Sequence, residues 1–267
     1  MQQPPDTAAL LPSVIAAVRA AGRAIMAVYR GDFEVRYKGD ASPLTEADLT
    51  AQRLLQGALA SLTPTVPIVS EEAVAVPYET RRSWPMHWLV DPLDGTRDFV
   101  ARSDQFSVNV ALVRDGRPVL GVVHAPVSDL TYSGGDGLRA ERRRGDGPAE
   151  PIAVRPPAAD ELVVLTSNRH HDVDTERYLT RLRQTHIVTL RRHGSALKAC
   201  LIAEGAAHLY PRLGPTWEWD TAASQAVLEA AGGVLRRAGG VAALRYGTRD
   251  LRNPPFYAAY GPGAPHP

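Results

Sequence analysis

The feature that most constrains the fold is an alternation of strand-like and helix-like segments after about residue 158. Short apolar runs are followed by longer segments whose apolar residues have helical spacing. The strand-like runs cover residues 161–167, 186–190 and 207–213, and the helix-like segments cover residues 172–182, 195–205 and 221–233. This alternation is typical of an α/β architecture with a largely parallel or mixed sheet. Residues 233–237 and 256–261 supply closing strands.

The N-terminal part of the chain predicts an α+β arrangement instead. Apolar residues recur at three- and four-residue steps from Leu10 to Val28, which indicates an amphipathic helix that ends near Tyr29. A strand is expected over residues 33–38, and the segment SPLT introduces a second helix over residues 46–62.

A strand-rich stretch follows the second predicted helix. Strand-like runs cover residues 66–70, 86–90, 106–113, 118–125, 131–135 and 138–142. The pair Asp115-Gly116 predicts a hairpin turn, and the arginine-rich segment 142–151 is expected to be a loop. We therefore expect two sandwiched halves, an α+β half over residues 1–157 and an α/β half over residues 158–267.

Composition excludes several classes of protein. The 267 residues carry a formal net charge of +1, so no overall field favours nucleic acid or an anionic membrane. Basic residues occur in three clusters, at residues 142–144, 191–192 and 236–237, but these clusters are dispersed and lack interleaved aromatic residues. We expect no nucleic-acid binding.

The cellular location is predicted from the N-terminus and the single cysteine. Cys200 has no partner for an internal disulfide, which suits a reducing compartment. The first residues lack the basic region of a secretory signal, and Arg19 and Arg23 interrupt the apolar segment that follows. The expected location is cytoplasmic, with at most peripheral contact at the inner face of a membrane.

Four carboxylates stand where apolar runs end: Glu71, Asp91, Asp94 and Asp220. Sites in α/β proteins gather at strand ends and in the loops beyond them. Clustered carboxylates, together with a backbone carbonyl such as that of Leu93, are the oxygen ligands that Mg²⁺ prefers. The sequence therefore favours a magnesium site that also holds a substrate phosphate.

Gly95 and Thr96 directly follow the two aspartates, and their backbone N–H groups suit an anion. Each motif alone has a simpler explanation. Asp94-Gly95 could be only a turn, Asp220 a helix N-cap, Glu71-Glu72 a solvated strand end, and Thr45 with Asp48 a capping box. Only the joint occurrence of these motifs favours a site.

The sequence resembles the inositol monophosphatase superfamily of Mg²⁺-dependent, typically lithium-sensitive phosphatases. The resemblance rests on SEE at residues 70–72, DPLDGT at 91–96 and WDTAA at 219–223. Within that superfamily it is most similar to the bacterial branch that acts on 3'(2'),5'-bisphosphate nucleotides. This closer similarity rests on KGDASPLTEAD at residues 38–48, GSALKACLIAEGAAHLYPR at 194–212 and GPTWEWDTAA at 214–223.

The resemblance implies a layered α/β/α/β/α sugar-phosphatase fold and two or three bound Mg²⁺ ions. Glu71, Asp91 and the Leu93 carbonyl would hold one ion, and Asp91, Asp94 and Asp220 would hold a second. Gly95 and Thr96 would bind the scissile phosphate. Thr96, oriented by Asp48 with Glu71 nearby, would position and activate the attacking water.

The expected partner is a small-molecule nucleotide bisphosphate, and the oligomeric state is left open. Its binding residues would be Glu71, Leu93, Asp94, Gly95, Thr96, His170, Ser195, Lys198, Arg212 and Asp220. For three of these, structural alternatives stay open: Ser195 as a helix N-cap, Lys198 as a solvated lysine, and Arg212 paired with a nearby acid.

The resemblance implies hydrolysis of adenosine 3',5'-bisphosphate to AMP and phosphate, with the sulfated analogue as a second substrate. The alternative is the same chemistry on an inositol phosphate or another sugar phosphate.

Overall fold

The computed structural model describes residues 5–73, 75–159, 161–168 and 172–267. Its helices are α1 Thr7–Tyr29, α2 Glu46–Leu62, α3 Tyr78–Arg81, α4 Thr96–Val100, α5 Val173–Leu182, α6 Leu197–Ala203 and α7 Glu218–Ala230. Its strands are β1 Arg36–Tyr37, β2 Pro43–Leu44, β3 Ile68–Ser70, β4 Met86–Asp94, β5 Ser107–Arg114, β6 Arg117–Ala125, β7 Leu130–Gly135, β8 Leu138–Arg144, β9 Glu150–Pro151, β10 Glu161–Thr166, β11 Ile187–Arg192, β12 Leu209–Arg212, β13 Val234–Arg237 and β14 Phe256–Ala259.

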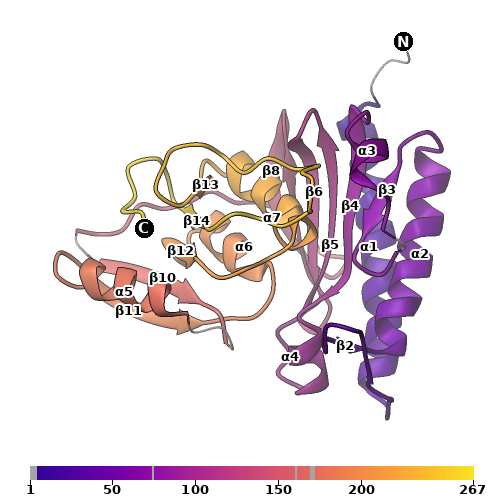
Figure 1. Cartoon of the computed structure of the whole chain (residues 1–267), viewed down its shortest axis with the longest axis horizontal. Helices are drawn as coiled ribbons and strands as arrows, with labels where there is room; N and C mark the ends of the chain where they lie inside the picture. The colour runs from indigo at the N-terminus through magenta and orange to yellow at the C-terminus, as the bar shows by residue number, and fades with distance from the viewer. Residues whose placement is uncertain (1–4, 74, 160, 169–171) are drawn as a thin grey trace.

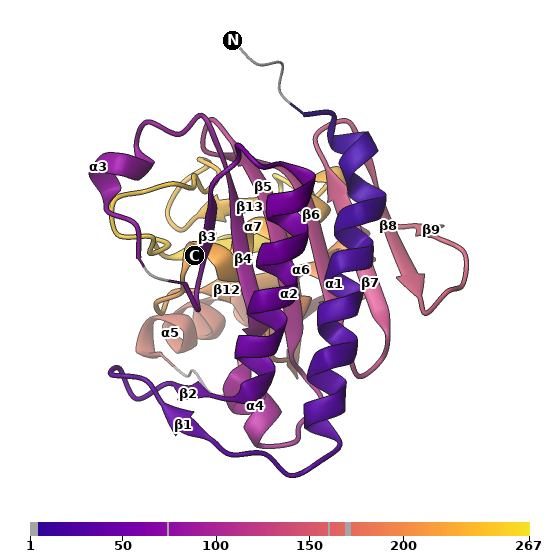
Figure 2. The same cartoon turned by 90° about the vertical axis from the view of Figure 1, so that its right-hand side faces the viewer.

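Helices and sheets alternate in layers, as expected (Figure 1). The larger sheet has the strand order β3-β4-β5-β6-β7-β8-β9, and α1 and α2 lie side by side on its outer face (Figure 2). Helices α6 and α7 lie between this sheet and the smaller one, whose order is β11-β10-β12-β14-β13. Helix α5 packs on the far face of the smaller sheet. The predicted α/β/α/β/α layering is confirmed.

The strands of the larger sheet are apolar on both faces because helices cover both. Along β5, Val108, Val110 and Leu112 pack with α1 and α2. The intervening Ala111 and Val113 pack on the other side, with α6 and α7. Successive side chains of a strand point to opposite faces, so burial of both faces produces a continuous apolar run.

Two predictions are confirmed: the hairpin turn at Asp115-Gly116 and the mixed sheet of the C-terminal half. Asp115 (φ 49°) and Gly116 (φ 72°) join β5 to β6 in the left-handed conformations that a tight hairpin requires. In the smaller sheet, β10 runs parallel to β11 and β12, whereas β12, β14 and β13 are antiparallel. The sheet is therefore mixed.

Two local predictions are wrong. The strand expected over residues 33–38 contracts to β1, because its only partner is the two-residue strand β2. The segment 142–151 is not all loop: Arg142–Arg144 complete β8, which pairs with β7, and Glu150–Pro151 forms β9. The expected boundary at residue 157 falls between β9 and β10.

Helix α1 is the one described helix that is long and apolar enough to cross a membrane by length and composition. Its buried stripe of Val14, Val18, Ala21 and Ile25 packs in the core beneath the larger sheet. This packing is what an amphipathic core helix provides.

Candidate active site

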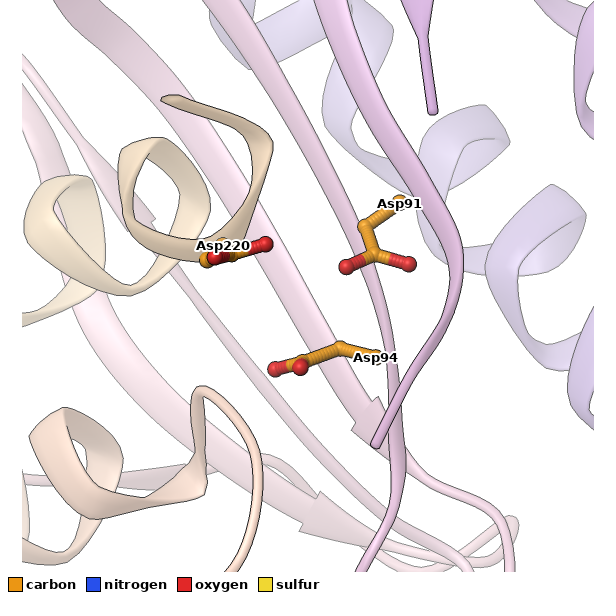
Figure 3. A group of neighbouring side chains, drawn as sticks. All are labelled: Asp91, Asp94 and Asp220. Atoms are coloured by element: carbon orange, nitrogen blue, oxygen red, sulfur yellow. The ribbon is translucent and has the colours of Figure 1, made fainter. Parts of the chain in front are cut away.

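Three aspartates meet between the larger sheet and α7. Asp91 and Asp94 come from the end of β4, and Asp220 comes from the first turn of α7 (Figure 3). One carboxylate oxygen from each lies within 4.8 Å of the others. The structure thus brings together three of the four carboxylates that the sequence singled out.

A β-bulge explains how two aspartates three positions apart point the same way. Asp91 pairs with Asn109 and Asp94 pairs with Ser107, so β4 contains one residue more than β5 between these pairs. In a regular strand, side chains three apart point to opposite faces, and the extra residue restores a common direction.

Asp220 has both a structural and a site role. The N-cap of α7 is Trp217, and its N–H donates to Asp220 Oδ2 at 2.8 Å. Asp220 is therefore the third helical residue, not the N-cap. One oxygen satisfies a free N–H of the helix, while the carboxylate also faces Asp94 and Asp91.

Burial and mutual repulsion suit this cluster to a cation. Burial, then Glu71, Asp94 and Asp220, raise the pKa of Asp91 well above its ordinary value. Burial, then Asp94, raise the pKa of Asp220 in the same way. The pKa of Asp94 is also raised by burial, although Lys198 and the Ala196 N–H oppose the change. One buried and two half-buried carboxylates that face one another fit a divalent cation with oxygen ligands.

Glu71 lies at the end of β3 and lines the same cavity, but Lys38 holds its carboxylate. Lys38 Nζ lies 2.8 Å from Glu71 Oε1 and 2.5 Å from Glu72 Oε1. The alternative of a solvated strand end is therefore wrong for this pair. Sequence reasoning did not assign Lys38, although it begins the segment KGDASPLTEAD that carried the resemblance.

Gly95 and Thr96 form the turn between β4 and α4. Gly95 has φ 89°, which an L-residue rarely adopts, and a Cβ there would lie 3.2 Å from the Gln105 carbonyl oxygen. Thr96 Oγ1 lies 3.2 Å from Asp48 Oδ1 and 3.1 Å from the Leu93 carbonyl oxygen.

Asp48 joins the cap of α2 to the site. Its Oδ2 accepts the Thr45 N–H at 2.7 Å, so the capping box is present. Its Oδ1 remains for Thr96. Capping and site roles coexist, and burial raises the pKa of this carboxyl.

Two buried cations, Lys198 and Arg212, form a second part of the cavity lining, called the cationic wall below, and the three aspartates form the aspartate wall. Lys198 Nζ donates to the carbonyls of Ser195 (2.6 Å) and His193 (3.3 Å), and burial lowers its pKa to about 8. Lys198 is therefore not a solvated surface lysine. Arg212 Nη2 donates to Pro215 O at 2.9 Å, while its buried Nε has no hydrogen-bond partner among the described residues. Within those residues, no carboxylate forms an ion pair with Arg212.

Ser195 lies in a turn just before α6. The N-cap position of α6 is Ala196, although Ser195 Oγ accepts the Leu197 N–H at 3.4 Å. Ser195 has φ 53°, and Ala196 N donates to Asp94 Oδ2 at 2.5 Å. Asn109, a further residue that sequence reasoning missed, donates to the same oxygen at 3.3 Å.

All these walls enclose one cavity of about 320 Å³. Of the predicted site residues, it is lined by Glu71, Asp91, Leu93, Asp94, Gly95, Thr96, Ser195, Lys198, Arg212 and Asp220. Asp48 lies behind Thr96, and His170 lies outside the described residues.

The model of the inositol monophosphatase family matches residues 6–262. The chain belongs to this family. The 3'(2'),5'-bisphosphate nucleotidase CysQ of Escherichia coli K12 is 45% identical over 225 residues, which cover 84% of this chain and 88% of that protein. The enzyme of the same name from Haemophilus influenzae is 34% identical, over 82% and 81%.

Solved structures of family members superpose closely on this chain. CysQ from Bacteroides thetaiotaomicron has a TM-score of 0.81 and 36% identity, over 93% of this chain and 96% of that one. The IMPase of Thermotoga maritima has a TM-score of 0.76 and 28% identity, over 94% and 92%. The resemblance predicted from the three motifs is confirmed.

Proposed function

We propose that this protein is a Mg²⁺-dependent phosphatase that removes the 3'-phosphate of adenosine 3',5'-bisphosphate, yielding AMP and phosphate. One observation carries the proposal: a single cavity is lined both by the cluster of three aspartates and by two buried cations, Lys198 and Arg212. A substrate with two phosphates fits both walls, and relatives at 34–45% identity carry the name of this activity.

The aspartate wall would bind the scissile phosphate through metal ions. Asp91, Asp94 and Asp220 would hold Mg²⁺, with Glu71 and the Leu93 carbonyl as further oxygen ligands, and we propose two or three ions. The ions supply neutralising charge for the phosphate and lower the pKa of the attacking water. Gly95 and Thr96, in the turn between β4 and α4, would bind the phosphate oxygens in the cavity.

Asp48 and Thr96 would orient the attacking water. The Thr96 hydroxyl donates to Asp48 Oδ1, which leaves the lone pairs of Oγ1 to accept a hydrogen from water. The buried Asp48 carboxylate, whose pKa is raised by burial, is suited to accept the Thr96 hydroxyl proton as Thr96 Oγ1 takes a proton from the water. Glu71, at the edge of the same cavity, would hold the water from the other side.

The cationic wall would bind the second phosphate. Lys198 and Arg212 are both buried beside the cavity, and Arg212 Nε still has a free donor among the described residues. Charged donors in such a site form strong hydrogen bonds with phosphate oxygens. Ser195 and His170 complete the proposed contacts to the nucleotide.

The rival substrate is an inositol phosphate or another sugar monophosphate. The likeness to the Thermotoga maritima IMPase favours it, but such a substrate would leave the cationic wall without a phosphate. The sulfated analogue of the bisphosphate presents the same 3'-phosphate and is a second proposed substrate.

The first experiment measures phosphate release from adenosine 3',5'-bisphosphate and from inositol 1-phosphate, with Mg²⁺, without it, and with added Li⁺. We expect Mg²⁺-dependent, Li⁺-inhibited preference for the nucleotide. Preference for inositol phosphate would retain the aspartate wall and reject the assigned role of Lys198 and Arg212. No release from either ester would reject the proposed reaction.

We further propose a cytoplasmic location with at most peripheral contact at the inner membrane face, and no nucleic-acid partner. Fractionation of cells into soluble and membrane fractions, followed by a salt wash of the membranes, tests the location. Protein retained after the wash would contradict it.

A further inference from the structure

Gln105 lies in the loop between α4 and β5 and reaches across to the other half of the molecule. Its Oε1 accepts the Gly194 N–H at 2.8 Å and the Asn168 side-chain N–H at 2.8 Å. Asn168 belongs to the loop after β10, and Gly194 belongs to the turn before α6. One carboxamide therefore fastens two separate loops of the C-terminal half.

Both fastened loops border the cavity. Gly194 lines it, and so does Ser167, the neighbour of Asn168. A Cβ on Gly194 would lie 2.4 Å from the Gln105 carbonyl oxygen, so the two backbones are in direct contact. The same carbonyl oxygen packs 3.2 Å from the Cβ position of Gly95. Gln105 therefore contacts both the turn at Gly95–Thr96 and the turn that contains Gly194.

The turn that Gln105 fastens holds Ser195 in an unfavourable backbone conformation. Ser195 has φ 53°, which is costly for a residue with a Cβ unless its surroundings impose it. The residues on either side supply the constraint: Gly194 is bound to Gln105, and Ala196 is bound to Asp94. Loss of either attachment would let the turn relax.

We propose that Gln105 is a positioning residue that fixes Ser195 and the loop at Ser167–Asn168 against the aspartate cluster. It thereby sets the affinity for the part of the substrate that lies away from the scissile phosphate. Identifying that part as the 5'-phosphate nucleoside rests on the proposed function. Within the described part of the chain, the Gln105 side chain forms no hydrogen bond with Asp91, Asp94, Asp220 or Thr96, so binding should depend on it more than the chemical step does.

The test compares Gln105→Met, which keeps the size but loses the acceptor, with Gln105→Glu, which keeps an acceptor oxygen. We expect Gln105→Met to raise KM for adenosine 3',5'-bisphosphate and the inhibition constant of AMP about tenfold, with kcat within about twofold. Gln105→Glu should restore most of the affinity. Gln184→Ala, at an exposed glutamine, is the matched control and should change nothing.

Hydrogen exchange gives a readout that needs no substrate. Gln105→Met should speed amide exchange at residues 194–196 while the melting temperature stays close to that of the parent protein. Unchanged exchange would overturn the proposal, as would equal losses with Met and Glu or a fall in kcat with KM unchanged. Failure of the parent protein to hydrolyse the bisphosphate would instead count against the proposed function, and the exchange result would still decide the role of Gln105.

Discussion

The two walls of the cavity handle buried charge in opposite ways. On the aspartate wall, Asp91, Asp94 and Asp220 face one another, and the pKa of each is raised because burial and like charge oppose ionisation. On the cationic wall, the protein's own carbonyl groups already accept hydrogen bonds from Lys198 and Arg212. The first wall is suited to an added cation, whereas the cations of the second are held by the chain, and Arg212 Nε has no hydrogen-bond partner among the described residues.

A fourth carboxylate, Glu218, has more hydrogen-bond donors among the described residues than any of the three aspartates. Glu218 is only two positions from Asp220, at the start of the same helix, and is fully buried. It accepts the N–H groups of Gly247 at 2.7 Å and Thr248 at 2.8 Å, and the Thr248 hydroxyl as well. Neighbouring carboxylates on one helix therefore differ in their partners: both oxygens of Glu218 accept hydrogen bonds, whereas Asp220 accepts the Trp217 N–H and also faces Asp91 and Asp94.

The largest expected effect is that of Asp91→Asn. Loss of a ligand charge should lower kcat about a thousandfold and weaken Mg²⁺ binding. In EDTA, however, the variant should melt at a higher temperature than the parent, because the substitution removes a buried like charge. Calorimetry in EDTA, with the exposed Asp136→Asn as control, checks this. A lower melting temperature would mean that the aspartates stabilise the metal-free fold.

Glu218→Ala should have the opposite effect on stability. Truncation leaves buried donors at Gly247 and Thr248 without an acceptor, which costs about 2–4 kcal/mol of unfolding free energy. The melting temperature should fall by about 4–16 °C, at about 2–4 °C per kcal/mol. Denaturant unfolding in EDTA measures the loss, and Glu218→Gln, which retains one acceptor oxygen, should lose less. If Glu218→Ala and the parent are equally stable, the hydrogen bonds of Glu218 do not stabilise the fold, and Glu218 does not differ from Asp220 in this respect.

Lys198→Ala tests the cationic wall with a smaller effect. KM for the bisphosphate should rise about tenfold, or about 1.4 kcal/mol, and more than KM for inositol 1-phosphate does. Steady-state kinetics with both esters provides the measurement, with Arg191→Ala on the exposed strand β11 as the control. If both KM values rise equally, Lys198 supports the Ser195 turn only and does not bind the second phosphate.

Much of the candidate site could be predicted from the sequence because its residues lie in short motifs. Asp91, Asp94, Gly95 and Thr96 belong to one motif, and Asp220 belongs to a second motif at the start of α7. The alternation of strand-like and helix-like runs predicted the α/β half and its mixed sheet, and the family resemblance implied the layered fold. The strand over residues 33–38 was overestimated because local β propensity does not reveal how little partner strand is available.

The missed residues act over long sequence separations. Gln105 bonds to Asn168 and Gly194 at separations of 63 and 89 residues, and Lys38 reaches Glu71 at a separation of 33. No periodicity or short motif encodes such pairs, because they depend on how the two sheets are placed. The open alternatives for Ser195 and Lys198 needed the same tertiary information: which residue caps α6, and whether the lysine is buried.

The pH dependence of KM should distinguish the contribution of Lys198, on the cationic wall, from that of the aspartate wall. Burial, with Arg212 nearby, lowers the pKa of Lys198 to about 8 from 10.5, and Asp94 limits the fall. Because the folded pKa is depressed, the folded state binds fewer protons than the unfolded state between pH 8 and 10.5. Lys198 therefore costs stability below pH 8, and unfolding free energy should increase with pH across that window.

For binding, the sign is reversed, because only the charged lysine attracts phosphate. KM for the bisphosphate should rise above pH 8, by up to about tenfold per pH unit, while KM for inositol 1-phosphate should rise less. Profiles of KM from pH 6.5 to 9.5 for both esters, in the parent and in Lys198→Ala, provide the measurement. If the variant keeps the rise, a group other than Lys198 controls the pH dependence of binding, and the assigned role of Lys198 is rejected.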